Sequence, residues 1–129
     1  MKKTLLALGL AAAGSLVAAQ PAANAGAQFR CGGVGQAEQQ QMKAQAANHD
    51  ALLTFAVSTG AYLADVDVQV RDSSGAVVLQ ARCNGPMMLL DLPAKGTYQV
   101  SASAEGRTQR KSLSLGAKTA TAVFVWPAS

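Results

Sequence analysis

Near the middle of the chain, three valines alternate with polar residues in the run Asp65-Val66-Asp67-Val68-Gln69-Val70-Arg71. Successive side chains of a β-strand point to opposite faces of its sheet, so residues two positions apart share a face. A strand with this pattern buries its valines and leaves its aspartates and glutamine in water. The run therefore predicts a half-buried β-strand.

Comparable short segments lie on both sides of this run and extend from Ala51 to Trp126. They are separated by turn residues, such as Asp72-Ser73-Ser74-Gly75 and Asn84-Gly85-Pro86. Counted together they predict seven short strands, with turns about every 8 to 12 residues, which is typical of a β-sandwich or barrel. We therefore expect an all-β domain over residues 51–129, preceded by one short helix.

One turn and the strand after it are the most specific part of this region, Leu92-Pro93-Ala94-Lys95-Gly96-Thr97-Tyr98-Gln99-Val100. Gly96 suits a turn position of positive φ. Tyr98 shares a strand face with Val100, so its ring should be buried, and its hydroxyl can bond back to the turn. Pro93, Gly96 and Tyr98 are thus the expected structural residues of this turn and of the core beneath it.

Together with the run at residues 65–70, this stretch resembles the carboxypeptidase regulatory-like domain. The resemblance covers about residues 62 to 126, and the whole chain is similar to small stand-alone secreted proteobacterial proteins that carry this domain. It implies a seven-stranded transthyretin-like (prealbumin-like, immunoglobulin-like) sandwich. In that family the sandwich usually assists folding or binding, and fold alone does not establish an activity.

The N-terminus has the layout of a secretory signal peptide over residues 1–25. A basic start, Met1-Lys2-Lys3, precedes an apolar run from Thr4 to Ala19 and then the small-x-small sequence Ala23-Asn24-Ala25. The apolar run is about 15 residues long, shorter than the roughly 20 that span a bilayer, although a permanent anchor is the alternative. We expect cleavage after Ala25, a periplasmic or secreted protein, and no transmembrane segment after cleavage.

Residues 26–50 are expected to form a Gly-rich segment and one short helix. The cluster Cys31-Gly32-Gly33-Val34-Gly35 follows no predicted strand, so turn residues are favoured over a dinucleotide-binding loop. Residues 36–47 are mostly Gln, Ala, Glu, Lys and Met, which favour helix. We expect this helix to end near Asn48 and to cover an end of the sandwich.

Both cysteines, Cys31 and Cys83, lie after the predicted cleavage site. In an oxidising compartment two thiols more often form a bridge than stay free. A redox pair is the alternative, but the Cys-x-x-Cys spacing that lowers a thiol pKa is absent. The sequence therefore predicts a structural disulfide between these two residues.

Few residues of the chain could carry chemistry. His49 is the only histidine, it lies beside Asp50, and no Gly-x-Ser-x-Gly nucleophile motif occurs. Asp65 and Asp67 should share a strand face, with Asp72 in the next turn, and calcium requires six to eight oxygen ligands. A solvated turn residue and a solvated strand face are the favoured interpretations. We expect no catalytic residue, no metal site and no cofactor.

Charge gives a weak indication of partners. Lys2 and Lys3 belong to the signal, so the remaining chain holds 9 of the 11 basic residues and all 7 acidic ones, too balanced for nucleic-acid binding. Four basic residues near one end of the sheet could meet anionic lipid, lipopolysaccharide or an acidic polymer, with a solvated edge as the alternative. They are Arg107, Arg110, Lys111 and Lys118.

These observations predict an exported, non-catalytic accessory or binding module of the cell envelope, whose partner is an envelope protein or polymer of unknown identity. A structural envelope protein that associates through its sheet edges is the alternative, and a periplasmic hydrolase is a third. The sequence predicts neither the ligand nor the oligomeric state.

Overall fold

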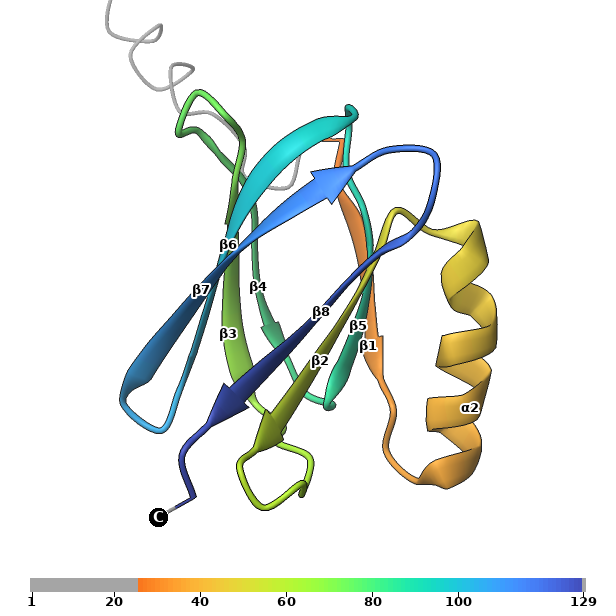
Figure 1. The fold of residues 1–129 in the computed structure, drawn as a ribbon, viewed down its shortest axis with the longest axis vertical. Helices are drawn as coiled ribbons and strands as arrows, with labels where there is room; N and C mark the ends of the chain where they lie inside the picture. Colours follow the sequence, from red (N-terminus) through yellow and green to blue (C-terminus); the bar gives the residue numbers. More distant parts are fainter. Residues whose placement is uncertain (1–25, 129) are drawn as a thin grey trace, which may run out of the picture.

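The computed structural model describes residues 26–128, which form two four-stranded β-sheets packed face to face and one helix (Figure 1). The predicted signal peptide, residues 1–25, lies outside the described residues. Sheet I contains β1 (Gln28–Gly32), β5 (Met87–Asp91), β2 (Ala51–Val57) and β8 (Ala120–Trp126), in that order. Sheet II contains β4 (Val77–Cys83), β3 (Val66–Arg71), β6 (Gly96–Ala104) and β7 (Arg107–Leu115), in that order.

The expectation of an all-β sandwich is confirmed, but the count of seven strands is wrong because the described residues hold eight. The additional strand is β1, which lies in the segment expected to be turn residues. It pairs antiparallel with β5, from Gln28 opposite Asp91 to Gly32 opposite Met87. Its sequence shows no apolar alternation, and most of it is exposed. The strand forms because the edge of β5 offers unpaired backbone groups for it.

The main core lies between the two sheets and follows the alternation of the sequence. Val66, Val68 and Val70 are buried, Asp67 and Arg71 are exposed, and Gln69 is partly exposed. Sheet I contributes three aromatic side chains with ring centroids 5.9 to 6.4 Å apart. They are Phe55, Phe124 and Trp126, all fully buried. These rings hold the parallel pair β2 and β8 against sheet II.

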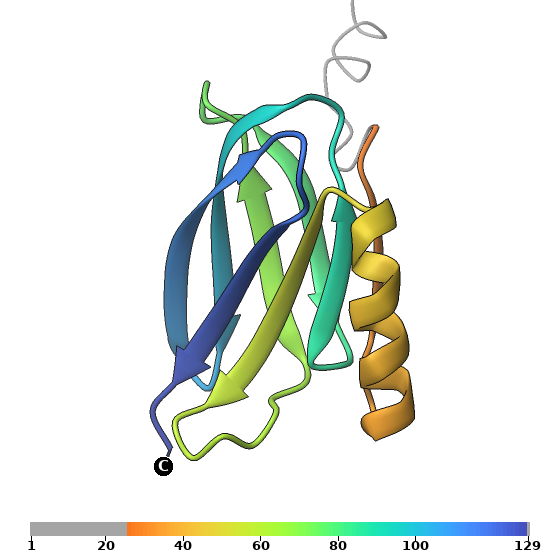
Figure 2. The ribbon, with the colours of Figure 1, turned by 45° about the vertical axis from the view of Figure 1, so that its right-hand side comes forward.

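The helix α2 (Gln36–Gln45), followed by the 3₁₀ turn Ala46–Asn48, lies against the outer face of sheet I (Figure 2). Met42 and Ala46 pack there on Leu52, Met87 and Leu89 in a second buried cluster. The expectation that the helix covers an end of the sandwich is therefore wrong. Residues 87–90 are apolar at every position, so β5 is buried on both faces and needs a cover on its outer side.

The predicted bridge between Cys31 and Cys83 is confirmed. It joins β1 of sheet I to β4 of sheet II across 52 residues of sequence. Beside it, a side chain at Gly85 would collide with the Gly32 carbonyl, so the two segments approach closely. Closing a loop of this length stabilises the fold by about 4 kcal/mol in the chain-entropy model.

The turn before β6 has the predicted geometry. Gly96 has a φ of +137°, which residues with a side chain rarely adopt. Tyr98 is 4% exposed, and its hydroxyl donates to the Ala94 carbonyl at 2.6 Å. Pro93 is exposed in the turn itself. This bond fixes the turn against the core of sheet II.

Candidate binding face

His49 takes part in a structural clasp. Its Nδ1 lies 2.6 Å from Asp91 Oδ2, and Asp91 Oδ1 accepts the Asp50 N–H at 3.0 Å. Asp50 Oδ2 in turn accepts the Leu92 N–H at 3.0 Å. Asp91 is the single side chain bonded to the His49 ring among residues 26–128, and the Thr119 hydroxyl donates to the His49 backbone carbonyl at 3.0 Å. The clasp joins the start of β2 to the end of β5.

The three aspartates considered for calcium do not come together as one site. Asp65 precedes β3 with a φ of +61°, so it does not share a strand face with Asp67 and that expectation is wrong. Asp67 instead lies 3.4 Å from Arg82. Asp72 caps its turn, and its hydrogen bonds, first of all the one from the Ser74 hydroxyl, hold its pKa below the usual value. Within residues 26–128, no three His, Cys, Asp or Glu residues lie together as a metal site.

The four basic residues expected to form one patch lie in different places. Arg107 begins β7, and Lys118 lies beyond the other end of that strand, which is about 27 Å long at 3.4 Å per residue. Arg110 is opposite Ser101, on the outer face of sheet II. Lys111 is opposite the buried Val100, so its side chain points away from the outer face that carries Arg110. The grouping near one end of the sheet is therefore wrong, and anion binding by single members stays a prediction.

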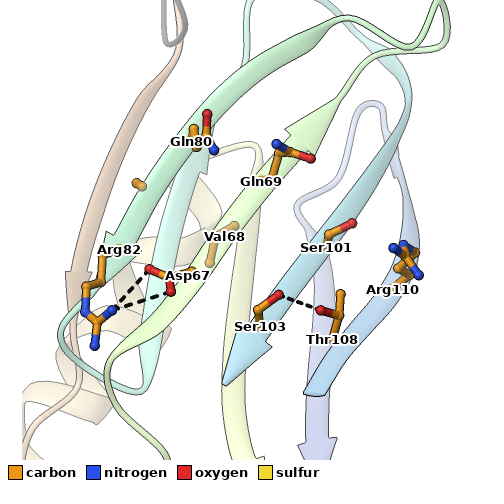
Figure 3. A pocket seen from close by; sticks show the side chains of 10 residues that line it. Asp67, Val68, Gln69, Gln80, Arg82, Ser101, Ser103, Thr108 and Arg110 are labelled. Atoms are coloured by element: carbon orange, nitrogen blue, oxygen red, sulfur yellow. Dashed lines mark hydrogen bonds and ion pairs between the residues drawn. The ribbon is translucent and has the colours of Figure 1, made fainter. Parts of the chain in front are cut away.

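A polar surface of another composition covers the outer face of sheet II. Two rows of side chains cross its four strands, and we call these two rows the polar face (Figure 3). The first row is Arg82, Asp67, Ser103 and Thr108. The second row is Gln80, Gln69, Ser101 and Arg110. They line a hollow of about 510 Å³.

The polar face follows directly from the alternation in the sequence. Val68 and Ala102 point into the core, so their neighbours Asp67, Gln69, Ser101 and Ser103 must point outward. In the structure β3 and β6 are the two central strands of sheet II, which places these four outward residues in its middle. The sequence predicts the strands but not the face, because only the strand order brings β4 and β7 beside β3 and β6.

Hydrogen bonds within the face leave most of its polar groups open to solvent. Arg82 Nη1 lies 3.4 Å from Asp67, with both side chains more than 60% exposed. The hydroxyls of Ser103 and Thr108 are 2.7 Å apart. Arg110 forms no ion pair with any residue from 26 to 128. The lining holds two guanidinium groups and one carboxylate, so its formal charge is positive.

This arrangement is suited to hydrogen-bonded recognition by side chains. Amides and hydroxyls both donate and accept, and guanidinium groups donate in a fixed fork. The backbone of β3 and β6 is bonded on both sides within the sheet, so it has little left to offer a ligand. No aromatic side chain lines the hollow, which leaves hydrogen bonds and charge as its means of binding.

No protein-family model matches the chain, and no curated protein matches it. The likeness to the carboxypeptidase regulatory-like domain therefore remains a proposal.

The ten-residue α2 is too short to cross a bilayer, and no other helix among residues 26–128 is long and apolar enough to do so.

Proposed function

We propose that this protein is an exported, non-catalytic binding module of the cell envelope, and that it binds through the polar face. The observation that carries this proposal is the hollow of about 510 Å³ on the outer side of sheet II. It is lined by charged, amide and hydroxyl side chains, and no other element of residues 26–128 covers it. The exposed ion pair of Arg82 and Asp67 contributes about 1 kcal/mol or less to stability, so these groups can bind a ligand at little cost to the fold.

Two features support export. Residues 1–25 have the sequence pattern of a secretory signal. The bridge between Cys31 and Cys83 is a bond that persists mainly in oxidising compartments such as the periplasm.

The placement of His49 supports a role without catalysis. Its Nδ1 is engaged by Asp91, and no hydroxyl or thiol bonds to its ring in the described chain. The Thr119 hydroxyl donates to the backbone carbonyls of Ala46 at 2.7 Å and His49 at 3.0 Å, and not to the His49 ring. Nucleophilic catalysis requires a nucleophile within hydrogen-bond reach of its base. The clasp therefore gives His49 a structural role, which is to hold the start of β2 against the end of β5.

The turn at Pro93, Gly96 and Tyr98 supports the resemblance to the carboxypeptidase regulatory-like domain. In that family the sandwich is usually an accessory, which agrees with a binding role. The strand β1 and the helix α2 are additions to the seven strands that the resemblance implies.

A self-associating structural protein is the second candidate, and the exposed edge strand β8 favours it. Val123 and Val125 are 50% and 47% exposed on this strand. Light scattering over a range of concentrations tests it. A dimer that Val123→Lys converts to monomer supports this candidate, and a monomer at all concentrations excludes it.

The proposed function is tested by cosedimentation of the purified protein with insoluble bacterial envelope material. We expect the double variant Gln69→Ala, Ser101→Ala to lose most of the retention. The matched control is Gln40→Ala, Gln41→Ala, which changes two exposed positions of α2 on the far side of the molecule. Equal retention of the two double variants, or no retention of the unmodified protein, would contradict the proposal.

A further inference from the structure

We propose that the polar face binds a carboxylate-bearing oligosaccharide, with the sugar carboxylate on Arg110 and the sugar hydroxyls on the side chains between β4 and β7. This inference rests on the proposed function and specifies its ligand.

The polar groups of the second row match the hydroxyl groups of a sugar. Each sugar hydroxyl both donates and accepts a hydrogen bond, and so do the amide of Gln69 and the hydroxyl of Ser101. In Figure 3, Gln69 and Ser101 lie on neighbouring strands between Gln80 and Arg110. Strands are about 4.8 Å apart, so this row of four positions extends about 14 Å, enough for a short oligosaccharide.

The charges of the face favour an acidic sugar over a neutral one. Arg110 is exposed and has no ion pair within residues 26–128, so its guanidinium is available for a two-point contact with a carboxylate. Hydrogen bonds between charged groups are about twice as strong as those between neutral groups. Since the face has no aromatic ring on which a sugar could stack, this charge-assisted contact is the strongest that it can offer.

The same charges disfavour densely charged ligands. Asp67 stands in the hollow, and its partner Arg82 is already 3.4 Å from it. Only Arg110 therefore adds net positive charge to the lining. A polyphosphate or a nucleic acid would place further negative charge near Asp67, and like charges repel. One carboxylate on a sugar, flanked by neutral hydroxyls, fits this distribution better.

Peptide and lipid ligands find little to bind on this face. An extended peptide binds either to a free sheet edge or to pockets for its side chains. The centre of the face consists of β3 and β6, which are paired on both sides, and the apolar residues in the lining are Val68 and Ala81. The strands at the centre of the hollow therefore offer no free edge, and its lining forms no apolar pocket.

The test is a titration of the purified, ¹⁵N-labelled protein with aldotetraouronic acid, a xylotriose that carries a single glucuronic acid carboxylate, followed by the amide signals in two-dimensional NMR spectra. The methyl ester of the same oligosaccharide serves as the neutral probe. We expect shifts at Gln69 and Ser101, no shift at Lys43 on α2, and binding of the ester at least tenfold weaker.

The variants Arg110→Gln and Lys111→Gln form a matched pair, since they remove one positive charge each from adjacent residues that leave β7 on opposite sides. Arg110→Gln should weaken binding of the acid about tenfold and leave binding of the ester unchanged. A tenfold change in affinity is about 1.4 kcal/mol, close to the contribution of one charged hydrogen bond. Lys111→Gln should change neither by more than about twofold.

Three results would overturn the inference. Equal binding of acid and ester at Gln69 and Ser101 would show that the face binds sugars without using charge, and the proposed function would survive. Equal weakening by both variants would show unspecific attraction to a basic protein. The absence of shifts on the polar face would exclude this ligand class, and cosedimentation that still depends on Gln69 and Ser101 would then keep the proposed function intact.

Discussion

The outer faces of the two sheets differ in what they present and in what covers them. On sheet I, Leu52, Met87 and Leu89 point outward and are buried under α2. On sheet II, the corresponding outward positions carry Gln69 and Ser101, and no element covers them. Apolar outward residues require a cover, because exposed apolar surface is unfavourable in water. Polar outward residues require none, and sheet II therefore keeps a face that is free for a ligand.

The cover of sheet I is also incomplete. The helix packs over β5 and the first part of β2, and the outer side of β8 remains open. Val123 and Val125 lie there, about half exposed. The molecule thus has an apolar exposed strip on one sheet and a polar hollow on the other, and the two proposed functions correspond to these two surfaces.

The largest effect is expected from the disulfide, which joins β1, the strand that precedes α2, to β4 of sheet II. Replacing both Cys31 and Cys83 by serine should lower the free energy of unfolding by about 4 kcal/mol. In this double variant, hydrogen exchange should show that the amides of β1 and α2 lose more protection than those of β3 and β6. Uniform loss of protection throughout the molecule would show that the covered and bare sheets do not differ in this way.

A second effect, of similar or smaller size, should separate the two outer faces directly. Leu89→Ala empties a site beneath α2 and should destabilise the protein by about 2 to 5 kcal/mol in denaturant melts. Ser101→Ala, at an outward position of sheet II, should change stability by no more than about 0.5 kcal/mol. Comparable losses from the two variants would mean that the polar face serves folding, against its assignment as a binding face.

The smallest effect concerns the turn that anchors sheet II. Tyr98→Phe keeps the buried ring and removes the hydroxyl that donates to Ala94, so it should cost about 1 kcal/mol. Gln99→Ala, the next residue on the outward side, should stay within about 0.5 kcal/mol and serves as the control. If thermal melts gave Gln99→Ala the larger loss, the inward and outward positions of β6 would have been assigned incorrectly.

Much of the fold could be predicted because its determinants are local. The alternation at Val66, Val68 and Val70 reports which side of a strand faces water, and it holds in the structure. The chain has two cysteines, so a single intramolecular pairing was possible, and it is the one that forms. The turn at Gly96 and Tyr98 is likewise contained within a few residues.

The polar face could not be predicted to the same extent. Its side chains come from four strands, and Arg82 and Arg110 lie at opposite edges of the sheet. Arg110 and Lys111 were expected in one patch near one end of the sheet, but adjacent residues of a strand point to opposite sides. Strand order, which no local pattern specifies, decides which outward residues become neighbours.

The sequence by itself determined the alternating strands, the pairing of the two cysteines and the need to bury both sides of residues 87–90. These features depend on each residue's preference for water or for a partner, which is a property of the residue and its near neighbours. Only the tertiary structure decided that residues 28–32 form a strand, that α2 covers sheet I, and that His49 joins Asp91. Each of these depends on a partner more than 40 residues away, or on a surface that exists only after the sheets have formed.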